Sequence, residues 1–245
     1  MTEKDNIFRQ EGRVEDFKFN EEVVNVFDDM VVRSVPFYEE LQRMLGEIAK
    51  GYCKPNTRIY DFGCSTGTTL MSLMHEVDDA SVSFVGIDNS KFMLEKAKAN
   101  VQKYKKKSEV SFIEADLNKV DMPIEDASVV IMNWTLQFVR PIYRAALLKH
   151  IYDGMAPGGV LLICEKILLD DSNLNRLYID LYYAFKRRNG YSELEIAQKR
   201  EALENILMPC TVKENVELLK GAGFGYVDTF FRWYNWAGII SLKQL

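Results

Sequence analysis

The sequence predicts an α/β fold, in which a mostly parallel sheet of seven strands with an antiparallel last strand carries helices on both faces. Three observations support this fold class. Short apolar runs alternate with segments of helical periodicity, which is the pattern of consecutive βαβ units. Two further short strands follow each other closely near the end of the chain, as in a hairpin. The chain of 245 residues, 47% hydrophobic and 27% charged, is large enough to bury such a core.

The first part of the chain is predicted to be helical. Residues 1–20 are polar and are expected to form an extended arm. A helix is predicted at 21–32, because Asn20 is a suitable N-cap and acids occupy the first turn. A second helix is predicted at 36–51, because proline favours a first turn and apolar residues follow at helical spacing.

From residue 58 onwards, the pattern is alternating. The predicted strands are 58–61, 82–87, 110–113, 128–132, 159–164, 226–233 and 239–242. The predicted helices between them are 66–76, 90–103, 141–152 and one that begins with the capping box of Thr211 and Glu214. The segment from about residue 170 to residue 208 breaks the alternation of strands and helices, and we interpret it as a helical insertion. We therefore expect a helical extension at 1–54 and an α/β region at 55–245, together forming one structural domain.

Composition excludes several classes of function. The formal net charge of −5 argues against a polynucleotide as the main partner, and the one dense basic run, at 103–107, is interpreted as a solvated helix end. Only two histidines are present, which leaves few candidates for zinc catalysis or a catalytic triad. The four cysteines lack metal-ligand spacing, so we expect no metal and reduced thiols in a cytoplasmic protein. No secretory signal or membrane span is visible.

The strongest local motif is a glycine-containing turn after the first predicted strand. It reads Asp-Phe-Gly-Cys-Ser-Thr-Gly over residues 61–67 and includes Gly63, Cys64 and Ser65. Glycines allow the backbone to turn tightly and approach a ligand, and the carboxyl ends of parallel strands are where ligands bind. The spacing differs from the dinucleotide fingerprint and from a Walker A loop. The alternative interpretation is a generic turn.

Polar residues also follow the next three strands. Asp88 is placed to bind a ribose diol, with capping of the following helix as the alternative. Asp116 and Leu117 follow the third strand, where the carboxylate could accept from the amine of adenine or stabilise a turn. Asn133 ends an otherwise apolar strand, which suggests a site, with a solvated strand end as the alternative.

These features together resemble the class I S-adenosyl-L-methionine (SAM) methyltransferase fold over about residues 55–245. A more specific resemblance spans nearly the whole chain. Five segments follow the pattern of carboxy-S-adenosyl-L-methionine (carboxy-SAM) synthases: 33–38, 61–65, 86–90, 133–138 and 189–200. The last segment, Asn-Gly-Tyr-Ser-Glu-Leu-Glu-Ile-Ala-Gln-Lys-Arg, is the most specific, because ordinary methyltransferases have no such insertion.

The resemblance implies an activity and a set of site residues. Its members convert SAM and prephenate into carboxy-SAM and phenylpyruvate, and a separate transferase uses the product to modify wobble uridine in tRNA. It implies a homodimer, with no stable direct contact to nucleic acid or membrane. The matching positions imply ligand contacts by Tyr38, by Gly63, Cys64 and Ser65, by Asp88 and Asn89 at the ribose, by Asp116 and Leu117 at the adenine, by Asn133 near the sulfonium, and by Arg200.

Arg200 is the predicted catalytic residue, expected to bind the carboxylate added to the methyl carbon. A guanidinium forms two parallel charge-assisted hydrogen bonds with a carboxylate. The alternative is a solvated helix face, on which Lys199 and Arg200 lie beside the acids of 193–201. No general base is identified. Tyr182 and Tyr191 could line a prephenate pocket, although aromatic packing is the simpler role.

Two other functions remain open from the sequence. One is a conventional SAM-dependent methyltransferase that acts on a small molecule or tRNA. The other is a SAM-binding protein without catalysis, since no general base stands out.

Overall fold

The structure is a computed structural model that describes residues 3–12, 14–104 and 108–245. Its strands are β1 Arg58–Phe62, β2 Ser83–Asp88, β3 Val110–Glu114, β4 Ala127–Asn133, β5 Met155–Leu168, β6 Cys210–Thr211, β7 Tyr226–Trp233 and β8 Trp236–Leu242. Its helices are α1 Glu21–Ser34, α2 Tyr38–Tyr52, α3 Thr68–Glu76, α4 Lys91–Tyr104, α5 Pro141–Gly154, α6 Ser172–Arg188, α7 Glu193–Leu203 and α8 Val212–Ala222, with a 3-10 turn at Leu136–Phe138.

The sheet confirms the predicted fold class. Its strand order is β3-β2-β1-β4-β5-β8-β7, and all the pairings are parallel except those of β8 with β5 and β7. The two-residue β6, which was not predicted, pairs with β5 because that strand continues beyond its predicted end to Leu168. The chain leaves β1 towards β2 and β3 and returns to β4 on the other side of β1. This reversal creates the crevice at which α/β folds bind ligands.

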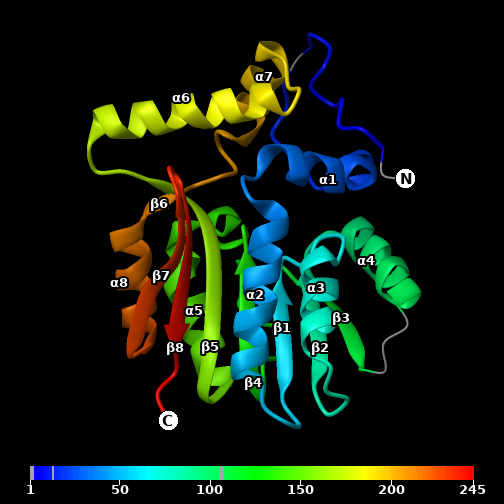
Figure 1. Cartoon of the computed structure of the whole chain (residues 1–245), viewed down its shortest axis with the longest axis vertical. Helices are drawn as coiled ribbons and strands as arrows, with labels where there is room; N and C mark the ends of the chain where they lie inside the picture. Colours follow the sequence, from blue (N-terminus) through cyan, green and yellow to red (C-terminus); the bar gives the residue numbers. More distant parts are fainter. Residues whose placement is uncertain (1–2, 13, 105–107) are drawn as a thin grey trace.

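Helices cover both faces of the sheet (Figure 1). Alternate side chains of β4 enter two separate clusters: Val129 and Ile131 pack with residues of α2 and α3, whereas Val130 and Met132 pack with residues of α5 and α8. This two-sided burial explains why the parallel strands read as continuous apolar runs rather than as an alternating pattern.

A third layer lies across the carboxyl ends of the parallel strands (Figure 1). It consists of the N-terminal arm, described at residues 3–12 and 14–20, with α1, α6 and α7, and we call it the cap. Local signals in the sequence determine where its helices begin. Asn20 caps α1 by accepting from the backbone of Val23 at 3.1 Å, and Ser192 forms a capping box with Glu195 at the start of α7.

Some helix boundaries differ from the prediction because of backbone conformation. α2 begins at Tyr38 instead of residue 36, since Phe37 has a left-handed φ of 54°. α3 begins at Thr68 instead of residue 66, since Gly67 has a φ of 81°. Lys103 is exposed in the last turn of α4, and residues 105–107 of the predicted basic run lie outside the described residues.

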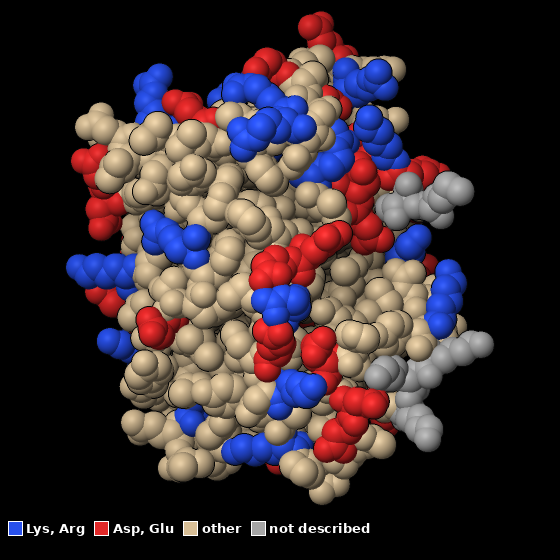
Figure 2. Space-filling model, viewed as in Figure 1, with Lys and Arg blue, Asp and Glu red and all other residues tan. Residues whose placement is uncertain are grey.

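The outer face of α2 carries alternating acids and bases, visible at the centre of Figure 2. There Arg43 forms ion pairs with Glu40 and Glu47 at an exposed position. Among the described residues, no helix is both long and apolar enough to cross a membrane.

Candidate functional site

A cavity of about 850 Å³ lies at the carboxyl ends of the parallel strands, beneath the cap. The turn after β1, the ends of β2 to β5, and helices α2, α6 and α7 all contribute to its wall. The structure brings every predicted site residue to this cavity: Tyr38, Gly63, Cys64, Ser65, Asp88, Asn89, Asp116, Leu117, Asn133 and Arg200.

The turn between β1 and α3 has little freedom to move. The amides of Gly63 and Cys64 both donate to the carbonyl of Ile87, at 2.7 and 2.9 Å. Gly63 has a φ of 73°, and a Cβ at this position would lie 2.4 Å from Oγ1 of Thr135. Ser65 also has a positive φ, of 47°. The motif is therefore a shaped backbone cradle rather than a generic turn.

Asp88 joins the glycine turn to the end of β2. Its Oδ2 accepts from the amide of Ser65 at 2.9 Å, and its Oδ1 accepts from the amide of Ser90 at 2.8 Å. Each carboxylate oxygen can accept a second hydrogen bond, so these contacts leave capacity for a ligand diol. Burial raises the pKa of Asp88, and the backbone amides oppose that shift. Asn89, next to it, is exposed at the cavity edge.

Asp116 and Asn133 each present an unused acceptor. Oδ1 of Asp116 accepts from the amide and the side chain of Asn118, at 3.0 and 2.8 Å, and among the described residues nothing donates to Oδ2. Nδ2 of Asn133 donates to Thr69 at 3.2 Å, whereas its buried Oδ1 has no partner. A buried carbonyl oxygen without a donor is costly, so this atom is suited to a ligand.

Tyr38 and Arg200 line the cavity from two different helices, α2 and α7. Tyr38 begins α2, and burial of its phenol raises the pKa well above its ordinary value. Arg200, in the last turn of α7, is exposed and has neither an ion pair nor a hydrogen bond to another described residue. Its guanidinium is therefore free to bind an anion.

Three lysines that were not among the predicted residues also line the cavity. Lys166, Lys186 and Lys199 come from β5, α6 and α7, and we call them the lysine cluster. Burial lowers their pKa values, to about 8 for Lys166 and Lys199 and to about 7 for Lys186. The sequence alternative that placed Lys199 on a solvated face is wrong, because that residue is only 8% exposed.

Aromatic side chains complete this end of the cavity. Tyr182 and Trp236 line it with ring centroids 5.3 Å apart, and Nε1 of Trp236 is buried without an acceptor. The hydroxyl of Tyr182 donates to the carbonyl of Ser34 at 3.0 Å. Tyr191 is not a lining residue, and its hydroxyl instead donates to Asp5 of the N-terminal arm at 2.5 Å.

Two buried carboxyl groups lie behind the wall. Burial and the nearby Asp88 raise the pKa of Asp61 to about 8, and its Oδ2 has no partner. Burial also raises the pKa of Glu165 to about 8. Glu165 accepts from the amides of Leu136 and Gln137, at 2.9 and 2.8 Å, and so anchors the turn after β4.

The wall has two electrostatically different ends. Acids gather at the ends of β2 and β3, where Asp88, Glu114 and Asp116 line the cavity. Cations gather at the end of β5 and on the cap, where the lysine cluster and Arg200 line it. The acidic end, the backbone cradle and the orphaned oxygen of Asn133 fit a nucleoside that carries a sulfonium, such as SAM. The cationic end fits carboxylates.

Comparisons with known proteins agree with this geometry. A methyltransferase domain family model matches residues 59–159. A carboxy-S-adenosyl-L-methionine synthase of Methylococcus capsulatus is 52% identical, covering 98% of this chain and 99% of the relative. Proteins with the same name from Desulfotalea psychrophila and Aliivibrio fischeri are 46% and 41% identical, each covering 99% of this chain and 99% and 100% of the relatives.

Solved structures share the fold at low sequence identity. A protein of Methanococcus maripaludis, described as a SAM-dependent methyltransferase, superimposes with a TM-score of 0.63 at 19% identity, covering 96% of this chain and 97% of that one. Human N-acetylserotonin methyltransferase, in complex with SAM, superimposes with a TM-score of 0.62 at 17% identity, covering 92% of this chain and 57% of that one.

Proposed function

The chain belongs to the carboxy-S-adenosyl-L-methionine synthase family, and from this premise we propose that it converts SAM and prephenate into carboxy-SAM and phenylpyruvate. One observation carries the proposal beyond the family name. A single cavity combines an acidic end suited to a nucleoside with a cationic end that an ordinary methyl transfer does not need.

The proposed binding mode follows the residues along the wall. The diol of the ribose is bound by Asp88 with Asn89 beside it, and the amine of adenine is bound by Oδ2 of Asp116 with Leu117 packed nearby. Gly63, Cys64 and Ser65 border the nucleoside, because this turn lines the cavity next to Asp88. Tyr38 and the free Oδ1 of Asn133 lie towards the sulfonium end.

The proposed reaction balances without a base from the protein. Loss of the ring carboxylate of prephenate as CO₂, with departure of the ring hydroxyl as hydroxide, gives aromatic phenylpyruvate. The hydroxide takes a proton from the methyl group of SAM, which the sulfonium makes acidic, and forms water. The methyl carbon, with its remaining electron pair, bonds to the CO₂ and becomes a carboxymethyl group.

The contribution of the protein is to hold the two substrates together and to exclude water. The cap covers the carboxyl ends of the strands, so CO₂ is released within reach of the methyl carbon. Arg200 is proposed to act on the reacting atoms directly, by binding the new carboxylate as it forms. Because this charge is absent from SAM, the interaction stabilises the later stages of the reaction selectively.

A methyltransferase that acts on a small molecule or on tRNA is the second candidate function. The fold and the nucleoside end of the cavity suit it equally well. It leaves the cationic end without a role, however, since methyl transfer adds no carboxylate to the nucleoside.

The wider biological role is also a proposal. We propose that the product supplies the carboxymethyl group of wobble uridine in tRNA through a separate transferase, and that the chain works as a cytoplasmic homodimer that does not itself hold tRNA. The acidic net charge and the four free cysteines support this assignment.

The deciding experiment is incubation of the purified chain with SAM and prephenate, followed by mass spectrometry of the nucleosides. The proposal expects a species heavier than SAM by one carboxyl group, with phenylpyruvate formed in equal amount. Formation of S-adenosylhomocysteine only in the presence of a methyl acceptor, without carboxy-SAM, would support the second candidate instead.

A further inference from the structure

The lysine cluster lies against aromatic rings at the cationic end of the cavity. Nζ of Lys166 lies 5.2 Å from the ring centroid of Tyr182, and Nζ of Lys186 lies 5.0 Å from it. Nζ of Lys199 lies 5.5 Å from the ring of Tyr191 and 3.4 Å from Oγ of Ser34. Three separate elements, β5, α6 and α7, thus direct ammonium groups to one region of the wall.

The protein compensates these charges only in part: Asp5 and Asp29 favour the charged form of Lys199 without forming an ion pair with it. Among the described residues, no Asp or Glu forms an ion pair with any of the three lysines. The charged groups that lower the pKa of Lys186 are all cations: Lys199, Lys166 and Arg200. Lys186 is only 5% exposed, and burying a repelled charge is costly unless an anion accompanies it.

A neutral donor lies beside the cluster. Nε1 of Trp236 is buried, has no acceptor and belongs to a lining residue. This end of the cavity therefore offers hydrogen-bond donors next to the aromatic faces of Tyr182 and Trp236. A carboxylate with an adjacent carbonyl oxygen, attached to a six-membered carbon ring, matches that combination of donors and apolar surface.

We propose that the lysine cluster and Trp236 bind the pyruvyl side chain of prephenate, through its carboxylate and its keto oxygen, and hold the same group in phenylpyruvate. This assignment rests on the proposed function, and it specifies which of the two carboxylates of the substrate the lysines bind.

The reaction itself selects between the two carboxylates. The ring carboxylate loses its charge when it leaves as CO₂, so cations bound to it would stabilise the substrate more than the transition state and slow the reaction. The pyruvyl carboxylate keeps its charge throughout, so binding it does not oppose the chemistry. The lysines therefore bind the unreacting end of the substrate and leave the ring carboxylate to face the methyl group.

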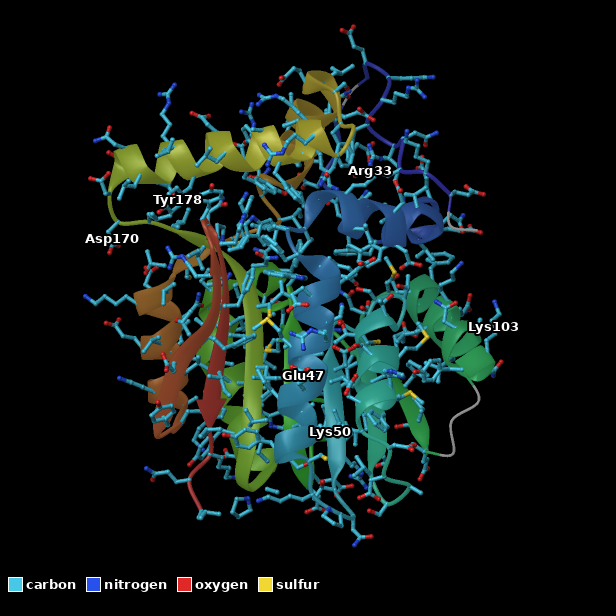
Figure 3. All side chains as sticks on the ribbon, in the orientation of Figure 1. Arg33, Glu47, Lys50, Lys103, Asp170 and Tyr178 are labelled. Carbon is cyan, nitrogen blue, oxygen red and sulfur yellow. The ribbon has the colours of Figure 1, made fainter. Side chains whose placement is uncertain are left out.

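Phenylpyruvate is the direct probe, because it carries only the carboxylate assigned to the cluster. We expect calorimetric titration into the SAM-saturated protein to show binding that Lys166→Met and Lys186→Met each weaken by about ten-fold to a hundred-fold. Lys50→Met, at an exposed position of α2 that does not line the cavity and lies away from the cap (Figure 3), is the matched control and should bind as the unmodified protein does. The methyl ester of phenylpyruvate should bind weakly to every variant.

The melting temperature separates a binding role from a structural one. Methionine has a similar length and removes an unpaired buried charge, so Lys186→Met should melt at the same temperature as the unmodified protein or higher. Unchanged phenylpyruvate affinity in both cavity variants would overturn the assignment, even in an enzyme that converts prephenate. Failure of the unmodified protein to convert prephenate would overturn the proposed function instead.

Discussion

Arg33 and Asn189 bond to each other in both directions across 156 residues of sequence. Nε of Arg33 donates to the carbonyl of Asn189 at 2.9 Å, and Nδ2 of Asn189 donates to the carbonyl of Arg33 at 3.0 Å. The guanidinium also lies 4.0 Å from the ring centroid of Tyr191. Arg33 is labelled near the end of α1 in Figure 3. The first and last of the five family-like segments are therefore partners that hold α1 against the turn between α6 and α7.

We expect this reciprocal pair to show strong coupling in a double-mutant cycle. Arg33→Met and Asn189→Ala should each lower the free energy of unfolding by about 1–3 kcal/mol, since each leaves a half-buried carbonyl oxygen of the partner without its donor, and Arg33→Met also removes the contacts with Asp5 and Asp29. The free energy of unfolding of the double variant should fall by clearly less than the sum of the two single changes. Urea unfolding measures all three, and strict additivity would show that the two residues act independently. Arg43→Met, which removes only exposed ion pairs on α2, should cause no measurable change.

Two glycine substitutions should have opposite effects on stability. Gly63→Ala places a Cβ 2.4 Å from Oγ1 of Thr135 at a φ of 73°, and should cost roughly 1–3 kcal/mol. Gly51→Ala, in α2 with no atom within 4 Å of the new Cβ, should stabilise by up to about 1 kcal/mol. Thermal or urea unfolding compares the two. A harmless Gly63→Ala would mean that the turn can relax.

Asp88→Asn should weaken SAM binding by about ten-fold or more, because the charged acceptor for the ribose diol is lost. Asp79→Asn is the matched control. Asp79 also accepts from the amide two residues on, at 2.9 Å, but it is only half-buried and does not line the cavity. Calorimetric titration with SAM measures both, and equal affinities would remove Asp88 from the binding site.

Arg200→Ala should weaken the binding of carboxy-SAM much more than the binding of SAM. Its affinity for carboxy-SAM should fall by about ten-fold to a hundred-fold, whereas its affinity for SAM should change little, because only the former carries the added carboxylate. Arg200→Lys should lose part of the effect, since an ammonium lacks the two-pronged geometry. Arg188→Ala, on α6 and outside the cavity wall, is the control. An equal loss for both ligands would indicate that Arg200 supports the pocket rather than reads the carboxylate.

Asp61 should make the free energy of unfolding depend on pH, because its carboxyl has one pKa in the unfolded chain and a higher one in the folded protein. Its pKa is raised from 3.8 to about 8 in the folded protein, so the folded state holds a proton that the unfolded chain has already released. The stability associated with this proton is complete below pH 3.8 and is lost as the pH rises through 8. The Asp61→Asn variant has no carboxyl group to deprotonate at this position, so it does not lose this stability as the pH rises.

The melting temperature of Asp61→Asn relative to the unmodified protein should therefore rise from pH 5 to pH 9. Calorimetric scans at matched ionic strength provide the measurement. Asp79→Asn should show no such trend over this range, because the pKa of Asp79 is lowered and the group is already charged at pH 5. A flat difference for Asp61→Asn would show that its carboxyl is charged in the folded protein throughout.

Much of the fold could be predicted because its signals are local. The apolar strands, the Asn20 cap and the Thr211 capping box depend on residues close in sequence, and the structure has each of them. The polar residues at the strand ends were also accessible, since parallel strands bring their carboxyl ends to one edge. All ten predicted site residues line the cavity for this reason.

The lysine cluster could not be predicted in the same way. Lys186 and Lys199 lie in charged helical segments that read as solvated, and only contacts with distant residues bury them. Lys199 contacts Ser34, which lies 165 residues away in the sequence. The only sequence signal was the match of the segment 189–200 to a family, which drew attention to Arg200 rather than to the lysine before it.

The N-terminal arm is bound to the insertion through backbone groups: Gln198 donates to the carbonyls of Phe8 and Gln10, and the amide of Phe17 donates to the carbonyl of Ala202. These contacts join the beginning of the chain to a segment made when most of it has already been synthesised. Closing such long loops is slow compared with forming neighbouring βαβ units. The nucleoside end of the cavity can therefore take shape early in folding, whereas the cationic end must wait for the two distant segments to meet.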